Sequence, residues 1–488
     1  MTLDESGPVD PLAAEDAGGK VIRGGGLRAG AHIAGVLSGA ISAPLVVRHL
    51  GVEGYGRLAL VGSILFVATA LTEGGLANVA TRQYAVGGEA ERRSLIAALL
   101  GLRIVLSVAG ASAAIAFGLI AGYDEVLMGG LGLGCVAMLA NSQWGAFHTA
   151  LVAQLRLSAV AALEIVRALA TTALFLAFVL AGASLGTFYV VAPAVALLML
   201  VAGAALVRRE VPLLPRVDLR RWSALLRETA VYAAATALGA IYFQVALVTT
   251  SLLTTGYETG LYSIAFRIVE LANGVPWLLA GSVFPVLAHA AARDVERLRY
   301  ATVRVTEGAL IAGGLFAVTI ALGARFGIDI VAPPEGRGSV PVLQIMAVSV
   351  MGTFLVAAWG FVLLSRQRYR ALMVSNAAAL ILAIVASLLL VPAYGAKGSA
   401  AVTAILEVAL AVMYGLALSR ELPGLRPGRS VVPRLAVALL AAFAVGLPLL
   451  LVHPAPAAVA GATAYMATLV ALKAVPPELL DALRRRSS

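Results

Sequence analysis

The stretch GLYSIAFRIVELANGVPWLLAGSVFPVLAHAA, residues 260–291, decides which kind of fold this chain can adopt. It is apolar over a length that exceeds the roughly 20 residues with which a helix crosses a bilayer. Yet it carries Arg267 and Glu270, whose i, i+3 spacing places both side chains on one helix face. A charge in hydrocarbon costs about 2.5–3.5 kcal/mol, so such side chains normally face protein or a wet cavity. The stretch therefore predicts a membrane helix with one charged face.

The composition of the whole chain indicates the same solvent. Of its 488 residues 60% are hydrophobic and 13% are charged, whereas soluble domains have about 45–50% apolar and about 25% charged residues. The net charge of +10 is scattered over short loops, which argues against a nucleic-acid partner. One cysteine, Cys135, and five histidines without metal-ligand spacing predict no disulfide, no metal site and no cofactor. We expect an all-α polytopic membrane protein in contact with membrane lipids.

Apolar runs of about 20 residues predict fourteen transmembrane helices. The runs lie near residues 29–47, 58–80, 95–121, 126–152, 158–180, 184–206, 230–253, 261–289, 303–324, 340–364, 371–391, 399–419, 435–452 and 457–473. The connections between them are mostly short, so helices that follow one another are expected to be antiparallel.

The Lys and Arg residues indicate which helix ends face the cytoplasm. With the N-terminus inside, most of the 36 basic residues fall in the inside segments. The outside loops then hold only Arg48, Arg57, Arg325, Arg337 and Lys397, and the spans hold Arg103, Arg167 and Arg267. This bias predicts that both termini are cytoplasmic.

The longest inside connection divides the chain after six spans. Within residues 208–229, Pro212 and Pro215 precede the amphipathic sequence DLRRWSALLRE (218–228), which we expect to lie as a helix at the cytoplasmic interface. The predicted organisation is a disordered cytoplasmic tail (1–26), an N-terminal lobe (27–207), this linker, a C-terminal lobe (230–420), two extra helices (421–474) and a basic cytoplasmic tail (475–488).

The two lobes share a sequence pattern. A Gly-x-Glu motif followed by a glycine occurs as Gly51, Glu53 and Gly56, and again about 205 residues later as Gly256, Glu258 and Gly260. A weaker similarity pairs GASLGTFYV (182–190) with YGAKGSAAV (394–402). Duplicated bodies are typical of transporters. Because six spans separate the copies, the symmetry axis is expected to run along the membrane normal.

Three stretches resemble signature regions of the Wzx-type polysaccharide flippases of bacteria, in the multidrug/oligosaccharidyl-lipid/polysaccharide superfamily. They are SAPLVVRHLGVEGYGRLAL (42–60), GYETGLYSIAFRIVELANGVPWLLAGSVFPVL (256–287) and LLLVPAYGAKGSAAVTAILEV (388–408), and the resemblance covers most of residues 25–420. It implies two six-helix bundles around a central cavity in the bacterial cytoplasmic (inner) membrane. It also implies a lipid-linked oligosaccharide as cargo, alternating access, and polysaccharide polymerase or export machinery as partners.

The seventh span departs from the pattern of this family. Members often carry an acidic residue early in that span, but YFQVALVTT (242–250) has Ala246 there and Gln244 two residues earlier. A coupling role for an acid at this place is therefore in doubt. Glu73 and Glu407 are the candidates for binding a coupling proton or sodium ion, and a packing role is the alternative for each.

Arginines within the spans are the candidates for contact with the cargo. The planar guanidinium of Arg267 suits a pyrophosphate, because it donates paired hydrogen bonds and stays charged. Glu164 and Arg167 repeat the i, i+3 spacing in the fifth span, and Arg103 has no acidic neighbour within the third. The alternative is that each Arg–Glu pair only neutralises itself between packed helices.

A polar stripe follows the fourth span. Asn141, Trp144 and His148 are spaced i, i+3, i+7 and share one helix face, which would suit contacts with sugars. Interhelical hydrogen bonds, which are common in membranes, are the alternative. The candidate cavity contacts are therefore Arg103, Asn141, Trp144, His148, Glu164, Arg167, Gln244, Arg267 and Glu270.

These features favour a flippase for a lipid-pyrophosphate-linked oligosaccharide in cell-surface polysaccharide biosynthesis. A lipid II-type flippase or a cation-coupled multidrug exporter is the nearest alternative, although arginines beside acids favour an anionic cargo. A membrane polymerase or glycosyltransferase is disfavoured, because the longest outside loop (325–340) has only about 16 residues. A channel or assembly scaffold is a third alternative, but the sequence shows no pore signature that would support it. We therefore expect a transporter rather than an enzyme.

Overall fold

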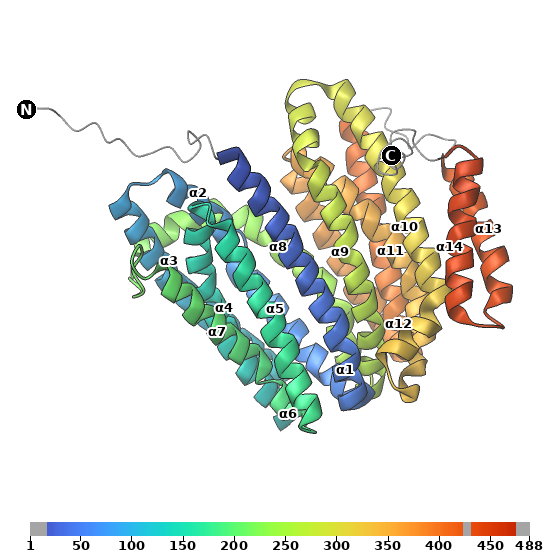
Figure 1. Cartoon of the computed structure of the whole chain (residues 1–488), viewed down its shortest axis with the longest axis horizontal. Helices are drawn as coiled ribbons and strands as arrows, with labels where there is room; N and C mark the ends of the chain where they lie inside the picture. Colours follow the sequence, from blue (N-terminus) through green and yellow to red (C-terminus); the bar gives the residue numbers. More distant parts are fainter. Residues whose placement is uncertain (1–16, 423–430, 475–488) are drawn as a thin grey trace, which may run out of the picture. The chain divides into compact units, whose positions relative to one another are not determined.

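The computed structural model describes residues 17–422 and 431–474, and in these residues all regular secondary structure is helical (Figure 1). The elements are α1 (Ala17–Glu73), α2 (Leu76–Val86), α3 (Glu89–Ile120), α4 (Glu125–Ala153), α5 (Leu157–Leu180), α6 (Leu185–Phe188), α7 (Val191–Val207), α8 (Leu219–Leu253), α9 (Gly256–Arg293), α10 (Val295–Val331), η1 (Pro334–Gly338), α11 (Ser339–Ser365), α12 (Tyr369–Glu421), α13 (Val431–Leu449) and α14 (Pro454–Ala471). The predicted all-α fold is confirmed.

Twelve helical segments of the described chain are long and apolar enough to cross a membrane. Two of them, Ile33–Val86 and Tyr369–Glu421, have 54 and 53 residues, more than twice the roughly 20 that a span needs. Each contains a glycine with left-handed backbone inside one helix, Gly51 (φ 72°) in α1 and Gly395 (φ 56°) in α12, and a further such glycine, Gly75 (φ 75°), separates α1 from α2 within Ile33–Val86. Single-glycine kinks therefore stand where the sequence predicted loops between the first and second and between the eleventh and twelfth spans.

The two kinks predict different sensitivities to an added methyl group. Gly51→Ala and Gly395→Ala both force alanine into left-handed backbone, at a cost of roughly 1–2 kcal/mol. At Gly51 a Cβ has open space, whereas at Gly395 it would lie 2.5 Å from Glu258 Oε2. That oxygen accepts a hydrogen bond from Ala396 N at 2.7 Å. In thermal unfolding of the purified protein, Gly395→Ala should lower Tm more than Gly51→Ala, and equal shifts would contradict this account of the turn.

The described residues form two compact units. Unit 1 comprises the described parts of Met1–Ser42, Thr72–Ile115 and Leu131–Ala230, and unit 2 those of Ala43–Leu71, Ala116–Gly130 and Val231–Ser488. Residues 43–71 and 116–130 were assigned to the N-terminal lobe by the sequence, yet they pack with the second half of the chain. The unit boundary near residue 230 lies inside the continuous helix α8.

The segment predicted as a separate interfacial helix within residues 208–229 is instead the beginning of α8, which continues from Leu219 to Leu253. Its apolar side does not face lipid alone, because Leu225 is fully buried in the core of unit 1. The Trp222 indole N–H donates to Ala98 O of α3 at 2.8 Å. The apolar face that was expected to lie on the membrane surface is thus used for packing against other helices. The helix continues into the next span because no proline after Pro215 interrupts it.

The helix α1 begins at Ala17, so residues 17–26, which were predicted as part of a disordered tail (1–26), are helical. No proline lies between Pro11 and Pro44, and a helix extends readily once its first turns exist. Residues 1–16, 423–430 and 475–488, which include the predicted basic tail, lie outside the described residues.

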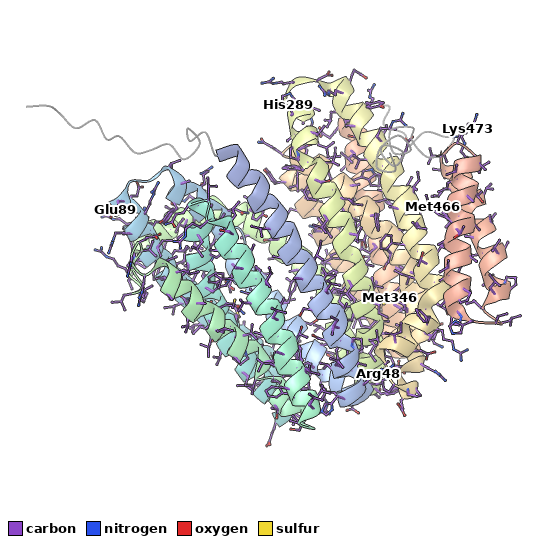
Figure 2. The ribbon with its side chains drawn as sticks, in the orientation of Figure 1. Arg48, Glu89, His289, Met346, Met466 and Lys473 are labelled. Carbon is purple, nitrogen blue, oxygen red and sulfur yellow. The ribbon has the colours of Figure 1, made fainter. Side chains whose placement is uncertain are left out.

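Unit 2 is a helix bundle in which α11 packs against α9, α10 and α12. The α13 and α14 hairpin packs on α10, where Tyr465 O–H donates to Ile311 O at 3.0 Å (Figure 1). Arg48 and His289 mark opposite ends of this bundle, with the buried Met346 between them (Figure 2). At its end, Arg48 Nη2 donates to Asp329 O at 2.6 Å and thereby joins α1 to α10.

Candidate functional site

The glycines of the repeated motif contact each other in unit 2. A Cβ on Gly56 would lie 2.7 Å from Gly260 Cα, and a Cβ on Gly260 would lie 2.2 Å from Val52 O. A Cβ on Gly256 would lie 2.9 Å from Glu53 Oε1. Real Cβ atoms are not found at such distances, so α1 and α9 pack here backbone against backbone.

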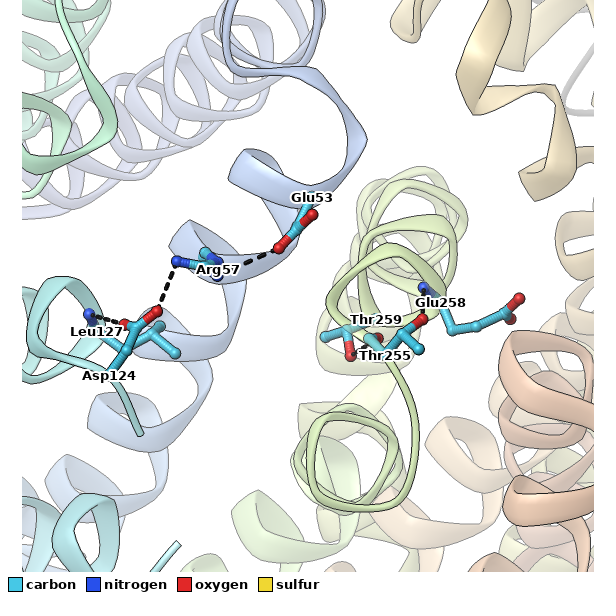
Figure 3. Close-up of polar contacts among 7 residues, drawn as sticks. All are labelled: Glu53, Arg57, Asp124, Leu127, Thr255, Glu258 and Thr259. Carbon is cyan, nitrogen blue, oxygen red and sulfur yellow. Dashed lines mark hydrogen bonds and ion pairs between the residues drawn. The ribbon is translucent and has the colours of Figure 1, made fainter. Parts of the chain in front are cut away.

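An ion-pair cluster lies beside this contact (Figure 3). Arg57 donates to Asp124 Oδ2 at 2.8 Å and to Glu53 Oε1 at 3.2 Å. Asp124 Oδ1 also accepts from Leu127 N at 2.9 Å and caps the first turn of α4. These side chains are 32–56% exposed, and exposed pairs contribute only about 0.2–1 kcal/mol each. The close backbone packing is therefore the stronger constraint at this end of unit 2.

A polar cavity of about 260 Å³ opens next to the cluster, between the α3–α4 turn, the α8–α9 turn and α1. Tyr123 and Ser251 share a hydrogen bond of 2.9 Å in its wall. Burial raises the pKa of the Tyr123 phenol, so the group remains a neutral donor and acceptor. The sequence did not single out these two residues, since Tyr123 lies in the α3–α4 turn and Ser251 in the last turn of α8, and neither belongs to a recognisable motif.

Arg267 and Glu270 form the pair that their spacing predicts. Arg267 Nη1 donates to Glu270 Oε2 at 2.5 Å, and the side chains are 32% and 36% exposed. This geometry is the one expected if the two side chains only neutralise each other. A guanidinium has five N–H donors, however, and among the described residues Glu270 is the only hydrogen-bond and ion-pair partner of Arg267, with Tyr55 nearby. The group therefore retains donors for an anion.

Arg103 is not alone, although no acid lies near it in the sequence. It is 2% exposed, and its Nη1 donates to Glu73 Oε1 at 3.1 Å and to Ser142 O at 2.9 Å. The guanidinium lies against Gly145, where a Cβ would be 2.3 Å from Nη1. Arg103 therefore joins two helices to the coupling candidate Glu73. The Glu164–Arg167 pair, by contrast, is local and partly exposed, with Nε and Oε2 3.6 Å apart.

The polar stripe of α4 is largely inside unit 1. Trp144 is 4% exposed, and its ring fills the space beside Gly203, where a Cβ would lie 2.3 Å from the indole. Its ring also meets the His148 ring edge-on at 5.7 Å between centroids. Asn141 Oδ1 is buried without a hydrogen-bond partner. Trp144 is thus packed between helices, and no interhelical hydrogen bond of Trp144 is seen in the described residues.

Gln244 and Glu407, the remaining candidates, lie in unit 2. Ser63 O–H donates a short hydrogen bond to Gln244 Oε1 and joins α1 to α8. Glu407 is 6% exposed and accepts from the Tyr242 O–H. In the described chain no group of three His, Cys, Asp or Glu side chains is arranged to hold a metal ion. The predicted candidates thus divide between the units, with Glu73, Arg103, Asn141, Trp144, His148, Glu164 and Arg167 in unit 1.

Solved structures of membrane transporters share this fold. The chain is similar to the lipid II flippase MurJ in an inward closed conformation, with 12% identity and a TM-score of 0.72 over 91% of this chain and 97% of that chain. An inward-facing multidrug resistance MATE family transporter has 13% identity and a TM-score of 0.61, over 82% of this chain and 95% of that one. A MOP superfamily transporter from Pyrococcus furiosus has 14% identity and a TM-score of 0.53, over 83% and 94%.

The family follows from the sequence match. A family model described as polysaccharide biosynthesis protein matches residues 21–291, which is more than half of the chain. The chain belongs to this family, and two of the three stretches that resemble Wzx-type flippases, 42–60 and 256–287, lie within the matched residues. The similar solved structures are described as a flippase and a multidrug resistance transporter. A comparison with curated proteins finds no match.

Proposed function

We propose that this transporter flips a lipid-pyrophosphate-linked oligosaccharide from the cytoplasmic to the outer leaflet of a bacterial inner membrane. The family associates the chain with polysaccharide biosynthesis. The observation that carries the proposal is the partly exposed Arg267 of α9, which retains N–H donors beside Glu270. Glu270 neutralises the guanidinium within the helix, and the planar fork of the remaining donors matches a pyrophosphate.

The proposed architecture has fourteen spans, because α1 and α12 each change direction at a glycine and would cross the membrane twice. Twelve of the spans form two six-helix lobes around a central cavity, and α13 and α14 are additions. The distribution of Lys and Arg supports cytoplasmic termini. In that orientation the Gly56–Gly260 contact and the cluster around Arg57 lie at the outer end.

Alternating access supplies the mechanism of the proposal. Cargo must reach the cavity from one side while the other side is closed. The backbone packing of α1 on α9 at Gly260 supports a closed outer end, since no side chain separates the two helices. Opening this end would release the cargo into the outer leaflet, and reforming the contact would reset the transporter.

Reconstitution in proteoliposomes tests this function directly. Purified protein is mixed with a fluorescent polyprenyl-pyrophosphate oligosaccharide in its lipid vesicles, and movement between leaflets is followed by quenching from outside. We expect flipping that depends on the protein and on the pyrophosphate. Transport of lipid II alone would support the lipid II-type alternative, and transport of a cationic dye alone would support the multidrug alternative; either result would overturn the proposal.

Arg267→Ala is expected to lower the flipping rate without lowering the amount of folded protein. Hydrogen bonds to charged groups contribute about 1.5–3 kcal/mol, so their loss corresponds to roughly 10- to 100-fold. Arg267→Lys keeps the charge but loses the planar fork, and it should retain an intermediate rate. Glu270→Ala is the matched control, because it removes the partner but leaves the guanidinium. Wild-type flipping by Arg267→Ala would exclude a contact with the cargo.

A further inference from the structure

A carboxyl group is buried in unit 2 with only one of its oxygens satisfied. Glu407 of α12 is 6% exposed. Its Oε1 accepts the Tyr242 O–H of α8, whereas its Oε2 is buried without any hydrogen-bond partner. An ionised carboxylate without a compensating partner is very costly in a protein interior. Thr353 of α11 also lies beside this carboxyl group, but its O–H donates to Ser349 O at 3.1 Å. Oε2 therefore still needs a proton or a cation.

The neighbouring helices do not provide one. A cavity of about 10 Å³ adjoins Glu407, and no Lys, Arg or His occurs among the residues that line it. Tyr242 of α8, Asn273 of α9 and Ser349 of α11 face it, together with Thr403 of α12. The nearest further titratable groups are the phenols of Tyr262 and Tyr414, which are neutral when protonated.

The hydroxyl groups of the cavity are already used as donors. Ser349 donates to Met346 O at 2.6 Å, and Thr403 donates to Ser399 O at 3.0 Å. Asn273 Oδ1 is a second buried acceptor without a partner. Two unsatisfied acceptors therefore line one cavity that has room for about one water molecule. A proton on Glu407 Oε2 would turn this acceptor into a hydrogen-bond donor, which Asn273 Oδ1 lacks.

The site is also closed on its α11 side. A Cβ on Gly352 would lie 2.8 Å from Glu407 Cβ, so the backbone of α11 lies directly against α12 at this level. No water path exists through such a contact. Exchange of a proton with solvent therefore requires the packing of α8 or α9 on α12 to change.

We propose that Glu407 is a proton-binding site, occupied on Oε2 in this conformation and hydrogen-bonded through the small cavity to Asn273. The carboxylate takes up one proton from the water on one side of the membrane when the site opens, and releases it to the water on the other side when the helices next rearrange. Proton uptake drives the transport cycle, a step that rests on the proposed flipping function. The proton site itself does not depend on the identity of the cargo.

Infrared difference spectroscopy of the purified full-length protein tests the site without cargo. At neutral pH we expect the carbonyl stretching band of a buried protonated carboxyl group, which Glu407→Gln removes. Tyr242→Phe should shift the band, because it deletes the O–H donor and keeps the ring. Glu73→Gln is the matched control and should leave the band unchanged, since Glu73 is paired with Arg103. Absence of the band from the wild type would overturn the proposal, as would its stoichiometric loss on addition of sodium.

The transport step has its own measurement. An imposed pH gradient across the proteoliposomes should accelerate flipping by the wild type severalfold and should leave flipping by Glu407→Gln unchanged. Acceleration of both proteins would exclude Glu407 as the coupling site. If the wild type shows the infrared band but does not flip the oligosaccharide, the proposed function fails and the proton site stands.

Discussion

Gly260→Leu is expected to abolish flipping, because it removes the contact that joins α1 to α9. A Cβ at this position would lie 2.2 Å from Val52 O, which is a backbone atom and cannot move aside as a side chain can. Overpacking a core usually costs about 1–3 kcal/mol, and a clash with the backbone exceeds that range. We expect folded protein whose outer end cannot close and a flipping rate at least about 100-fold below wild type, measured in proteoliposomes.

The same helix provides the control for this change. Gly274 also lies in α9, and a Cβ there has no atom within 4 Å. Gly274→Leu should therefore flip cargo at nearly the wild-type rate. Gly56 and Gly62 offer a second pair in α1, since only Gly56 lacks space for a Cβ. Equal rates for Gly260→Leu and Gly274→Leu would show that the contact is not required for transport.

Arg103→Met is expected to destabilise the protein more than any other change considered. It would leave Glu73 without its cation and Ser142 O without its donor. Removing one partner of a buried ion pair costs about 3–5 kcal/mol. The free energy of unfolding in denaturant, followed by tryptophan fluorescence, should fall by that amount for unit 1.

A double-mutant cycle separates the ion pair from simple packing. Glu73→Gln combined with Arg103→Met should lose less than the sum of the single changes, because no charge is then left unpaired. Gly145→Ala should also destabilise, since its Cβ would meet the guanidinium, whereas Gly129→Ala in the same helix has open space. Strict additivity of the two single changes would contradict a direct pair.

The local interactions of this protein could be predicted from the sequence. Hydropathy over about 20 residues identifies membrane helices because lipid imposes one length on them. The i, i+3 spacing of Arg267 and Glu270 implied their ion pair, which the structure confirms at 2.5 Å. Such pairs depend only on helix geometry, which is the same in any fold.

Non-local contacts were not predicted in the same way. Arg103 meets Glu73 across 30 residues, and Tyr242 meets Glu407 across 165. These pairs depend on how each helix is rotated about its axis and which neighbour it faces. Hydropathy does not encode that rotation when helices are apolar on all sides. The Gly56–Gly260 contact is intermediate, because the repeated motif marked both glycines before the structure joined them.

The sequence by itself determined that the chain is an all-helical membrane protein, where its helices lie, and to which family its signature stretches belong. Each of these properties is set by composition and short-range spacing. Only the tertiary structure decided that the predicted loops at Gly51 and Gly395 are single-residue kinks, that Arg103 is buried against Glu73, and that Glu407 Oε2 lacks a partner. Those properties arise from close packing, where one absent Cβ or one unpaired oxygen determines what can approach.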